Sequence, residues 1–252
     1  MSGAFEVYEP DRTWRGKLRR RAVRLAHRKP ARAPARSMVS FCFDDAPVSA
    51  ADAGAAVLEA RGLRGTFFIA GDLAGRDGPA GRTAGRDEVR RLHAAGHEIG
   101  CHTFSHLDCG QAHAALVIED VARNERTLAA WGVSRPTTFA YPYGDVAAPA
   151  KAALAGRFSL LRALHRGLIT RGADLNQAPA VGIEGDHGEA LARRWLRRAA
   201  GRPAWLILYT HDVADRPSPW GCSPAALARL ADEAIGAGFE VVTAAQGAWR
   251  VG

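Results

Sequence analysis

From residue 37 onward the sequence alternates between short apolar segments and amphipathic segments, and this alternation limits the folds that the chain can form. The segments expected as strands are 38–43, 65–70, 97–101, 137–142, 158–163, 204–210 and 239–244. The helices expected between them are 49–62, 86–96, 111–131, 145–156, 188–200 and 223–238. Strands that alternate with helices predict a mostly parallel sheet with helices outside it. This many strands in roughly 215 residues favours a barrel-like closure over a small open sheet.

The positive charge is concentrated near the N-terminus. Residues 11–36 carry eleven Lys/Arg and one Asp, a net charge of +10, while residues 1–10 carry −2. The whole chain carries +8, so residues 37–252 sum to zero (8 − 10 + 2). A nucleic-acid-binding domain needs a basic surface on its folded part, so we expect no nucleic-acid partner. The sequence predicts a basic arm over residues 1–36 and a single large domain, the candidate catalytic domain, over residues 37–252.

The arm contains a short helical pattern. Trp14, Leu18, Ala22 and Leu25 recur at helical spacing with arginines on the remaining faces, and prolines at 30 and 34 break any longer helix. A basic amphipathic helix can lie on an anionic membrane surface, so residues 11–29 are a candidate for such a contact. The alternatives are a solvated arm and a helix packed on its own domain.

The location of the protein is expected to be cytoplasmic. No apolar run reaches the roughly 18 residues of a membrane span, and the N-terminus lacks the hydrophobic core region of a signal peptide. Because of its basic arm, the protein could in addition bind peripherally to the inner face of a membrane.

Two polar motifs follow predicted strands directly. In FDDAP, Asp44 and Asp45 come after a buried strand, where two acids are costly unless a cation meets them; the alternative is a turn with helix-capping carboxylates. In HTFSH, His102 and His106 are four residues apart and share one face of a helix or helical turn. Asp45, His102 and His106 together form a set of three protein ligands, which is typical of a hydrolytic zinc site. Other divalent first-row metals suit the same set.

Two further motifs lie at strand ends. In FAYPYGD, Pro142 and Gly144 force an irregular turn that can aim a backbone N–H at a developing oxyanion; a plain strand-to-helix turn is the alternative. In LYTHD, His211 follows the most apolar strand of the chain. A single histidine in this position is more often a packed side chain than a catalyst.

FDDAP, HTFSH, YPYG and THD occur in this order, and in this order they resemble the polysaccharide deacetylases of carbohydrate esterase family 4, the NodB-homology domain. The resemblance covers roughly residues 38–245. More narrowly, VSFCFDDAP, FAYPYG and LYTHDVADRPSPWGCSP are similar to bacterial exopolysaccharide deacetylases, including the one that acts on the holdfast adhesin. The resemblance implies a distorted (β/α)7 barrel of the α/β class and metal-dependent removal of acetyl groups from N-acetylated oligo- or polysaccharides. The implied metal is zinc, with cobalt, manganese and nickel as alternatives.

The resemblance also implies roles for individual residues. Asp44 would be the general base, and the metal ligands would be Asp45, His102 and His106. The backbone N–H of Tyr143 would help to hold the oxyanion, and His211 would be the general acid.

The sequence departs from the family pattern at two points. The family usually has an arginine two residues before the proline of the third motif, where this chain has Ala140. Arg162, at the end of a predicted strand, is the candidate that replaces it, and Arg171 is the second. The motif that supplies an aspartate to tune His211 has no clean match, and Asp174 is the best substitute.

Other functions stay open from the sequence. The same metal site could deacetylate a peptidoglycan fragment or cleave a small amide. An inactive sugar-binding module is a further alternative, which Ala140 favours slightly and the four intact motifs disfavour. Tyr141, Tyr143 and Trp220 are aromatic residues that either stack on sugar rings or belong to the core.

Overall fold

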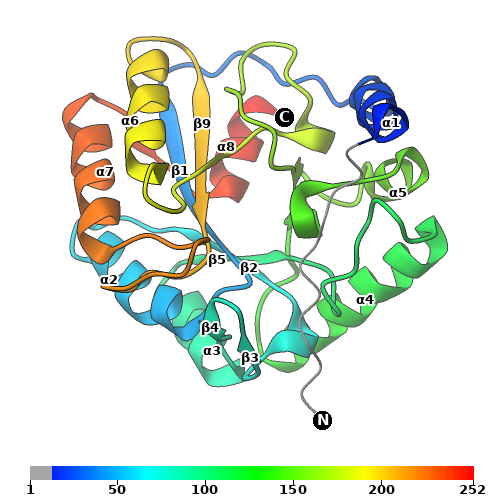
Figure 1. Cartoon of the computed structure of the whole chain (residues 1–252), viewed down its shortest axis with the longest axis horizontal. Coiled ribbons are helices and arrows are strands. Elements are labelled where there is room, and N and C mark those ends of the chain that lie inside the picture. Colours follow the sequence, from blue (N-terminus) through cyan, green and yellow to red (C-terminus); the bar gives the residue numbers. More distant parts are fainter. Residues whose placement is uncertain (1–12) are drawn as a thin grey trace.

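The computed structural model describes residues 13–252 and is built around a curved parallel sheet (Figure 1). The strand order is β7-β6-β5-β2-β1-β9-β8, and β10 pairs with the beginning of β1. All pairs in this sheet are parallel. The strands are β1 Met38–Asp44, β2 Thr66–Ile69, β5 Glu98–Cys101, β6 Thr138–Ala140, β7 Leu160–Arg162, β8 Val181–Gly182, β9 Trp205–Thr210 and β10 Glu240–Val241.

Helices surround the sheet and complete the distorted barrel that the sequence predicts. A parallel bridge between Arg162 and Ala178 links β7 to the segment before β8, which joins the two edges of the sheet. The helices are η1 Ala50–Gly54, α2 Ala55–Glu59, α3 Arg86–Ala94, α4 Ala114–Ala130, α5 Ala148–Leu154, α6 Gly188–Ala199, α7 Pro224–Gly236 and α8 Ala244–Val251. Three short 3₁₀ turns, η2 Gly71–Leu73, η3 Pro142–Gly144 and η4 Leu175–Gln177, lie in the connections.

The central strand shows why the apolar segments of this chain form strands. Every residue of β1 is buried, because helices cover one side of the sheet and the barrel interior fills the other. Phe41 and Phe43 pack toward the helices, while Met38 and Cys42 pack in the interior with Trp205 of β9. A strand covered on both faces reads as a continuous apolar run instead of an alternating one.

Most predicted elements form within a few residues of their expected bounds, and the exceptions have physical causes. The segment 239–244 was expected to be a strand, but only Glu240–Val241 pairs and a helix, α8, begins at Ala244. Thr243 caps this helix by accepting a hydrogen bond from the N–H of Gln246, and a cap overrides the local apolar pattern. The hairpin of β3 Asp77–Gly78 and β4 Gly81–Arg82, together with β8, consists of two-residue strands that are too short to give a periodic signal.

Helix α1, Trp14–Leu25, packs beside α5 and is tied to the barrel by a buried lysine. The Nζ of Lys151 donates to the carbonyl of Val23 at 3.0 Å and pairs with the Oδ2 of Asp174 at 2.6 Å. The Lys151 side chain has no exposed area, and Val23 is 3% exposed. One face of this helix therefore packs on the domain, as one of the three alternatives for the arm expects.

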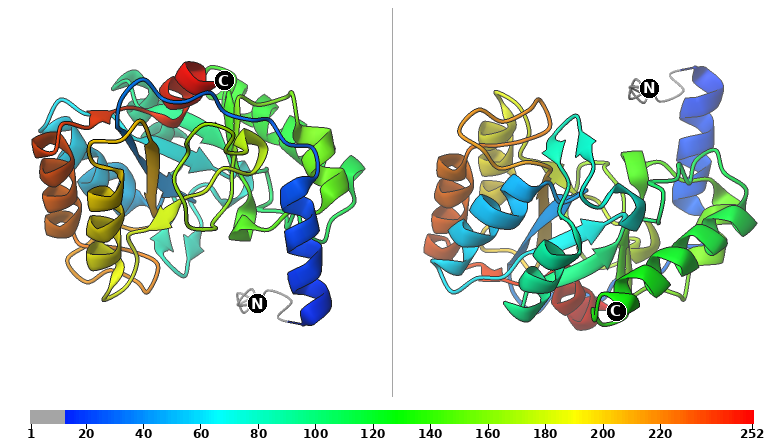
Figure 2. Two further views of the ribbon diagram at one scale, coloured as in Figure 1. Left: turned by 90° about the horizontal axis from the view of Figure 1, so that it is seen from above. Right: turned by 90° about the horizontal axis from the view of Figure 1, so that it is seen from below.

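A second contact holds α1 one turn before Val23. Arg19 donates to the carbonyl of Gly110 and to the Oδ2 of Asp145, both at 2.6 Å. Figure 2 shows that the N-terminal end of α1 extends beyond the barrel, on the side where the β3–β4 hairpin and the 211–222 loop project. None of the helices described for residues 13–252 has the length and apolar character of a transmembrane span.

We predict that Lys151→Met lowers the free energy of unfolding by about 3–5 kcal/mol, because it leaves the Asp174 carboxylate without its buried cation. Urea unfolding followed by circular dichroism measures this loss. The double variant Lys151→Met/Asp174→Asn should recover part of it. Arg76→Met, which breaks the exposed pair with Asp72, is the matched control and should cost less than about 1 kcal/mol. A similar small cost for Lys151→Met would show that this buried pair does not hold α1 in place.

Candidate active site

The carboxyl ends of the parallel strands bring the motif residues to one end of the barrel. Asp44 is the last residue of β1, and Arg162 is the last residue of β7. His102 comes directly after β5, and His211 directly after β9. In α/β barrels this end carries the catalytic loops. The structure therefore places together the side chains that the sequence offers from four separate segments.

Asp45, His102 and His106 form a cluster that can hold a metal ion. The Oδ1 of Asp45 lies 3.4 Å from the Nε2 of His106 and 3.7 Å from the Nε2 of His102. One ligand atom from each residue lies within 4.8 Å of the others, a spacing that suits a shared cation. The Oδ1 of Asp45 is buried and has no hydrogen-bond partner among the described residues, so it lacks a compensating group that a cation would supply.

The chain prepares His102 as a ligand. Its Nδ1–H donates to the carbonyl of Ala140 at 2.8 Å, which leaves Nε2 unprotonated and directed at the cluster. Burial, together with the charge of the neighbouring His106, lowers the pKa of His102 to about 3. His102 is therefore neutral at physiological pH, which is the form that binds a metal. These observations fit a divalent ion held by the two imidazoles and one carboxylate.

Backbone strain is concentrated in these loops. Six non-glycine residues between 13 and 252 have positive φ, and five of them lie here, with φ between 45° and 59°: Asp45, Ala46, Thr103, His106 and Tyr143. Such left-handed conformations are costly for residues with a side chain. His102 and His106 consequently meet through an irregular loop, and the helical turn expected from their spacing does not form. The strain indicates that this end of the barrel is organised for a purpose other than stability.

Asp44 is held by Arg162. The Nη2 of Arg162 lies 2.6 Å from the Oδ2 of Asp44, and the two side chains are 0% and 4% exposed. The Oδ1 of Asp44 has no hydrogen-bond partner among the described residues, so this oxygen can accept a proton. Arg162 pairs in register with Ala140 on the neighbouring strand. Arg162 therefore contacts Asp44 from the strand next to Ala140, whereas Arg171, the second candidate, is exposed in the turn before Asp174.

His211 is oriented by Glu184, which the sequence analysis missed. The Nδ1 of His211 lies 3.0 Å from the Oε1 of Glu184, and the two side chains are 20% and 21% exposed. Burial alone would lower the pKa of His211. The hydrogen bond to Glu184 and the charges of Asp44 and Asp45 outweigh this effect and raise the pKa to about 9. His211 therefore carries a proton at neutral pH, as a general acid must.

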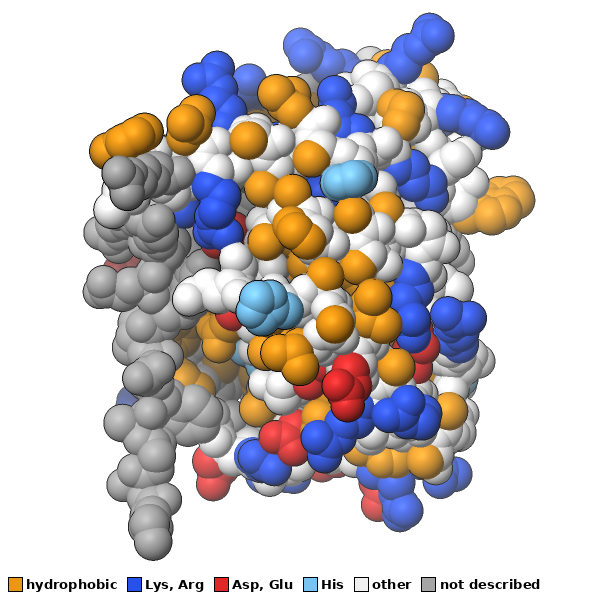
Figure 3. Space-filling model, turned by 90° about the vertical axis from the view of Figure 1, so that its right-hand side faces the viewer, with side chains coloured by type: hydrophobic (Ala, Val, Ile, Leu, Met, Phe, Trp, Pro, Cys, Tyr) orange, Lys and Arg blue, Asp and Glu red, His pale blue; other side chains and the backbone are white. Residues whose placement is uncertain are grey.

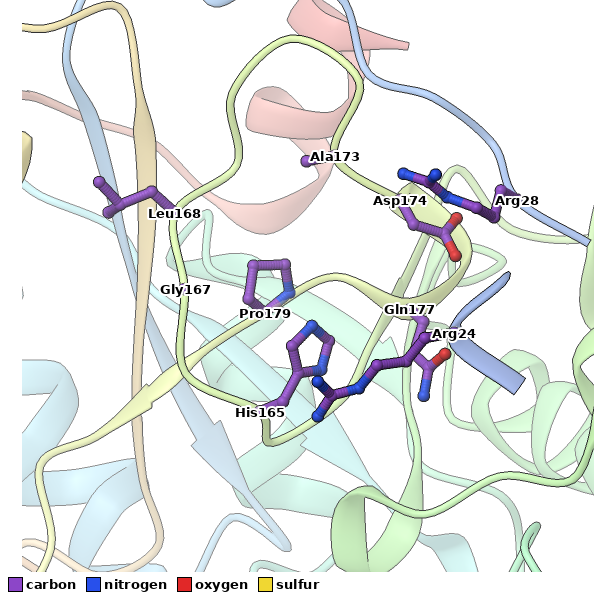
Figure 4. Close-up of a pocket in the computed structure, with 9 residues that line it drawn as sticks. All are labelled: Arg24, Arg28, His165, Gly167, Leu168, Ala173, Asp174, Gln177 and Pro179. Atoms are coloured by element: carbon purple, nitrogen blue, oxygen red, sulfur yellow. The ribbon is translucent and has the colours of Figure 1, made fainter. Parts of the chain in front are cut away.

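The expectation for Asp174 is wrong. Asp174 pairs with Lys151 and accepts hydrogen bonds from the backbone N–H groups of Lys29 and Asn176. It lies beside Arg28 in the wall of a cleft of about 260 Å³ next to α1 (Figure 4). Glu184 follows β8, a strand of only two residues, which is too short to produce a periodic pattern that would mark a strand end at this point of the sequence.

Tyr143 occupies a strained turn at the rim of the cluster. Its φ is 58°, and the N–H of Gly144 closes the turn by donating to the carbonyl of Tyr141 at 2.9 Å. The rings of Tyr143 and His106 meet edge to face with centroids 4.5 Å apart. Tyr143 and Trp220 are about 40% exposed, whereas Tyr141 is buried and donates to the carbonyl of Asn176. Tyr141 therefore belongs to the core, whereas the other two aromatic residues expose part of their surface to solvent.

A curved parallel barrel with a carboxylate–imidazole cluster at its strand ends defines a hydrolase-type α/β barrel. The family model described as polysaccharide deacetylase matches residues 31–156, half of the chain. The chain belongs to the polysaccharide deacetylase family, the NodB-homology family that the motifs indicate. The matched segment contains Asp44, Asp45, His102, His106 and Tyr143, whereas Arg162, Glu184 and His211 lie beyond it.

Several known proteins are similar to this chain in sequence or in structure. A chitin deacetylase from Pestalotiopsis sp is 31% identical over 117 residues, which are 46% of this chain and 38% of that protein's length. The solved structure of the chitin deacetylase from Colletotrichum lindemuthianum has a TM-score of 0.63 at 18% identity and covers 88% of this chain and 91% of that one. The Bc1960 peptidoglycan N-acetylglucosamine deacetylase gives 0.62 at 19% identity, with 88% and 92% covered. A protein from Mycobacterium smegmatis gives 0.66 at 17% identity, with 89% and 94% covered. These structures establish the fold.

We predict that Glu184→Gln moves the alkaline limb of the pH–rate profile to lower pH. Removing the carboxylate lowers the pKa of His211, so the general acid loses its proton at a lower pH. The turnover number should fall about 10- to 100-fold, as expected for a partner that orients a catalytic group. The profile of acetate release from N-acetylglucosamine oligomers measures both effects. Glu189→Gln, at the exposed pair with Arg229, is the control and should leave the profile unchanged. An unmoved limb in Glu184→Gln would refute the role of Glu184.

We predict that Arg162→Ala lowers turnover at least about 100-fold, because Asp44 loses the contact that positions it. Steady-state kinetics with the same oligomers measure the loss, and metal content measured in parallel should stay near one ion per chain. Arg171→Ala, at the exposed second candidate, should keep the wild-type rate. If Arg171→Ala were the damaging change, the assignment of the positioning arginine would be reversed.

Proposed function

We propose that this protein is a metal-dependent deacetylase that removes N-acetyl groups from N-acetylglucosamine-type residues of an exopolysaccharide or its precursor. One observation carries the proposal: a cluster that fits a cation, Asp45–His102–His106, lies beside an aspartate with one free oxygen, Asp44, and a protonated histidine, His211. An amide hydrolase needs a site for an activated water, a base for its proton and an acid for the leaving amine.

The metal ligands are Asp45, His102 and His106. Zinc is the ion we expect, since two imidazoles and a carboxylate with an open position are typical of catalytic zinc sites; cobalt, manganese and nickel suit the same donors. When bound, such an ion polarises the amide carbonyl and lowers the pKa of water toward about 7.

Asp44 acts as the general base. Arg162 holds one of its oxygens at 2.6 Å, and the other, Oδ1, accepts the proton of the attacking water. Because Asp44 ends β1 and Asp45 follows it directly, the base and the metal ligand are held at a fixed separation.

Tyr143 and His211 complete the reaction. The strained turn presents the backbone N–H of Tyr143 to the oxyanion that forms when water adds to the amide. A donor of this kind typically contributes about 2.7–4 kcal/mol. His211, held by Glu184, then donates its proton to the nitrogen of the sugar as the C–N bond breaks. The products are acetate and a free amino sugar.

Several features support a glycan as the substrate. Tyr143 and Trp220 expose aromatic surface at the mouth of the site, and aromatic faces pack well against sugar rings. Two similar proteins are named as a chitin deacetylase and as a peptidoglycan N-acetylglucosamine deacetylase, so a peptidoglycan fragment is the second candidate. The product also has a chemical use: each free amine becomes a cation near neutral pH, so the glycan gains charge that binds anionic surfaces.

We propose that the reaction takes place in the cytoplasm, on a lipid-linked precursor at the inner face of a membrane. The basic residues 11–29 would draw the enzyme to such an anionic surface. Recovery of the enzyme in a periplasmic fraction would contradict this location.

We predict that a chelator abolishes acetate release from N-acetylglucosamine oligomers and that added Zn²⁺ or Co²⁺ restores it. Asp44→Asn should retain about one metal ion per chain and lose turnover by a factor of about 10² or more. Asp45→Asn should lose the metal as well. Elemental analysis and acetate release, measured on the same preparations, separate the two effects.

Two results would contradict this mechanism. Full activity in excess chelator would remove the metal from the reaction. Metal loss in Asp44→Asn with retention in Asp45→Asn would mean that the two aspartates have the opposite roles. Comparing sugar oligomers, peptidoglycan fragments and small amides on the same preparations selects among the substrates.

A further inference from the structure

Helix α1 presents its larger apolar face to solvent. Leu18 and Leu25 are 59% and 73% exposed, Ala22 is exposed between them, and Trp14 is 69% exposed on the same face. The opposite face contains Val23, which is buried against the domain. A surface helix normally turns its apolar stripe toward the core, so the direction of this stripe is reversed. We call the surface of Trp14, Leu18, Ala22 and Leu25 the outer stripe.

Basic side chains border the outer stripe. Arg21, Arg24 and Arg28 are exposed along the helix and just beyond it. Arg24 and Arg28 also line the cleft of about 260 Å³ between the helix and the barrel (Figure 4). Figure 3 shows this side of the molecule, with basic and hydrophobic side chains together along its upper part, where α1 lies. Residues 11–36 carry +10, whereas residues 37–252 sum to zero.

The position of α1 relative to the active site is fixed. Arg19 binds the side chain of Asp145, which lies two residues after Tyr143, and the carbonyl of Gly110. Lys151 anchors the helix one turn further on, through the carbonyl of Val23. Both views of Figure 2 show the N-terminal end of α1 on the side of the loops that carry the active site, with α8 on the opposite side. The N-terminal end of the outer stripe therefore lies on the same side of the molecule as the loops of the active site.

We propose that the outer stripe of α1 docks the protein on an anionic lipid membrane, with the N-terminal end of the helix on the side of the active-site loops. Apolar side chains with arginines beside them match such a surface, because the apolar groups enter the interface and the arginines meet the headgroup phosphates. A second copy of the chain fits less well, since it would bring another +10 charge against the first. The docking surface stands without any assumption about chemistry, whereas its use, access to a lipid-linked glycan, rests on the proposed function.

Vesicle sedimentation tests the docking directly. The full chain is mixed with vesicles of phosphatidylcholine alone or with about 30% phosphatidylglycerol. Wild-type protein should bind the anionic vesicles and not the neutral ones, and salt should weaken the binding. Leu18→Ser/Leu25→Ser should reduce the binding about tenfold or more, because it removes apolar groups that enter the interface. Trp249→Ser is the matched control: Trp249 is 84% exposed on α8, at the opposite side, and its loss should leave binding unchanged.

Acetate release from soluble N-acetylglucosamine oligomers is measured on the same variants. The double variant should keep the wild-type rate, since neither leucine touches the site, so a failure of docking and a failure of catalysis give different results. Vesicle binding that survives the double variant, or no binding to either vesicle, would overturn the proposal. A wild-type dimer in light scattering that the double variant dissociates would also overturn it, by assigning the outer stripe to a second copy of the chain.

Discussion

A buried carboxylate–guanidinium pair at the end of the central strand organises the site. Asp44 and Arg162 are both excluded from solvent, and breaking such a pair typically costs about 3–5 kcal/mol because one charge is left uncompensated. Compared with apolar residues of similar size, however, buried pairs add little stability. The pair is therefore better explained by what it positions: one oxygen of Asp44 is held by the arginine, and the other remains free beside the metal ligands.

Two histidines at the site have opposite protonation because their environments differ. His102 is buried without a nearby carboxylate at hydrogen-bond distance and has a pKa of about 3, so it is neutral, as the proposed metal ligand must be. His211 contacts Glu184 and faces two aspartates, and its pKa of about 9 keeps it protonated, as the proposed general acid must be. Titratable groups whose pKa values are driven apart by their surroundings mark acid and base roles in catalysis. The protein achieves this separation with side chains from strands that are far apart in the sequence.

The basic arm and the barrel are more closely joined than their sequences indicate. Charge and proline placement divide the chain near residue 36, and that boundary stays a prediction. In the structure, α1 is held at two points one turn apart, by Arg19 to the loop beside Tyr143 and by Lys151, which also pairs with Asp174, to the carbonyl of Val23. One face of this helix is attached to the barrel and the other is apolar and exposed. A surface that binds the exposed face therefore also sets the orientation of the barrel.

The sequence by itself determined the order of strands and helices, the barrel class and the two motifs that supply the candidate metal ligands, because periodicity and strand-end chemistry are local properties. It also indicated Arg162 in place of the arginine missing at Ala140. Only the tertiary structure decided that Glu184, and not Asp174, partners His211, because β8 is too short to leave a pattern and the contact joins neighbouring strands β8 and β9. It likewise decided which face of α1 is buried, since an amphipathic helix pattern defines two faces but does not say which of them meets the protein.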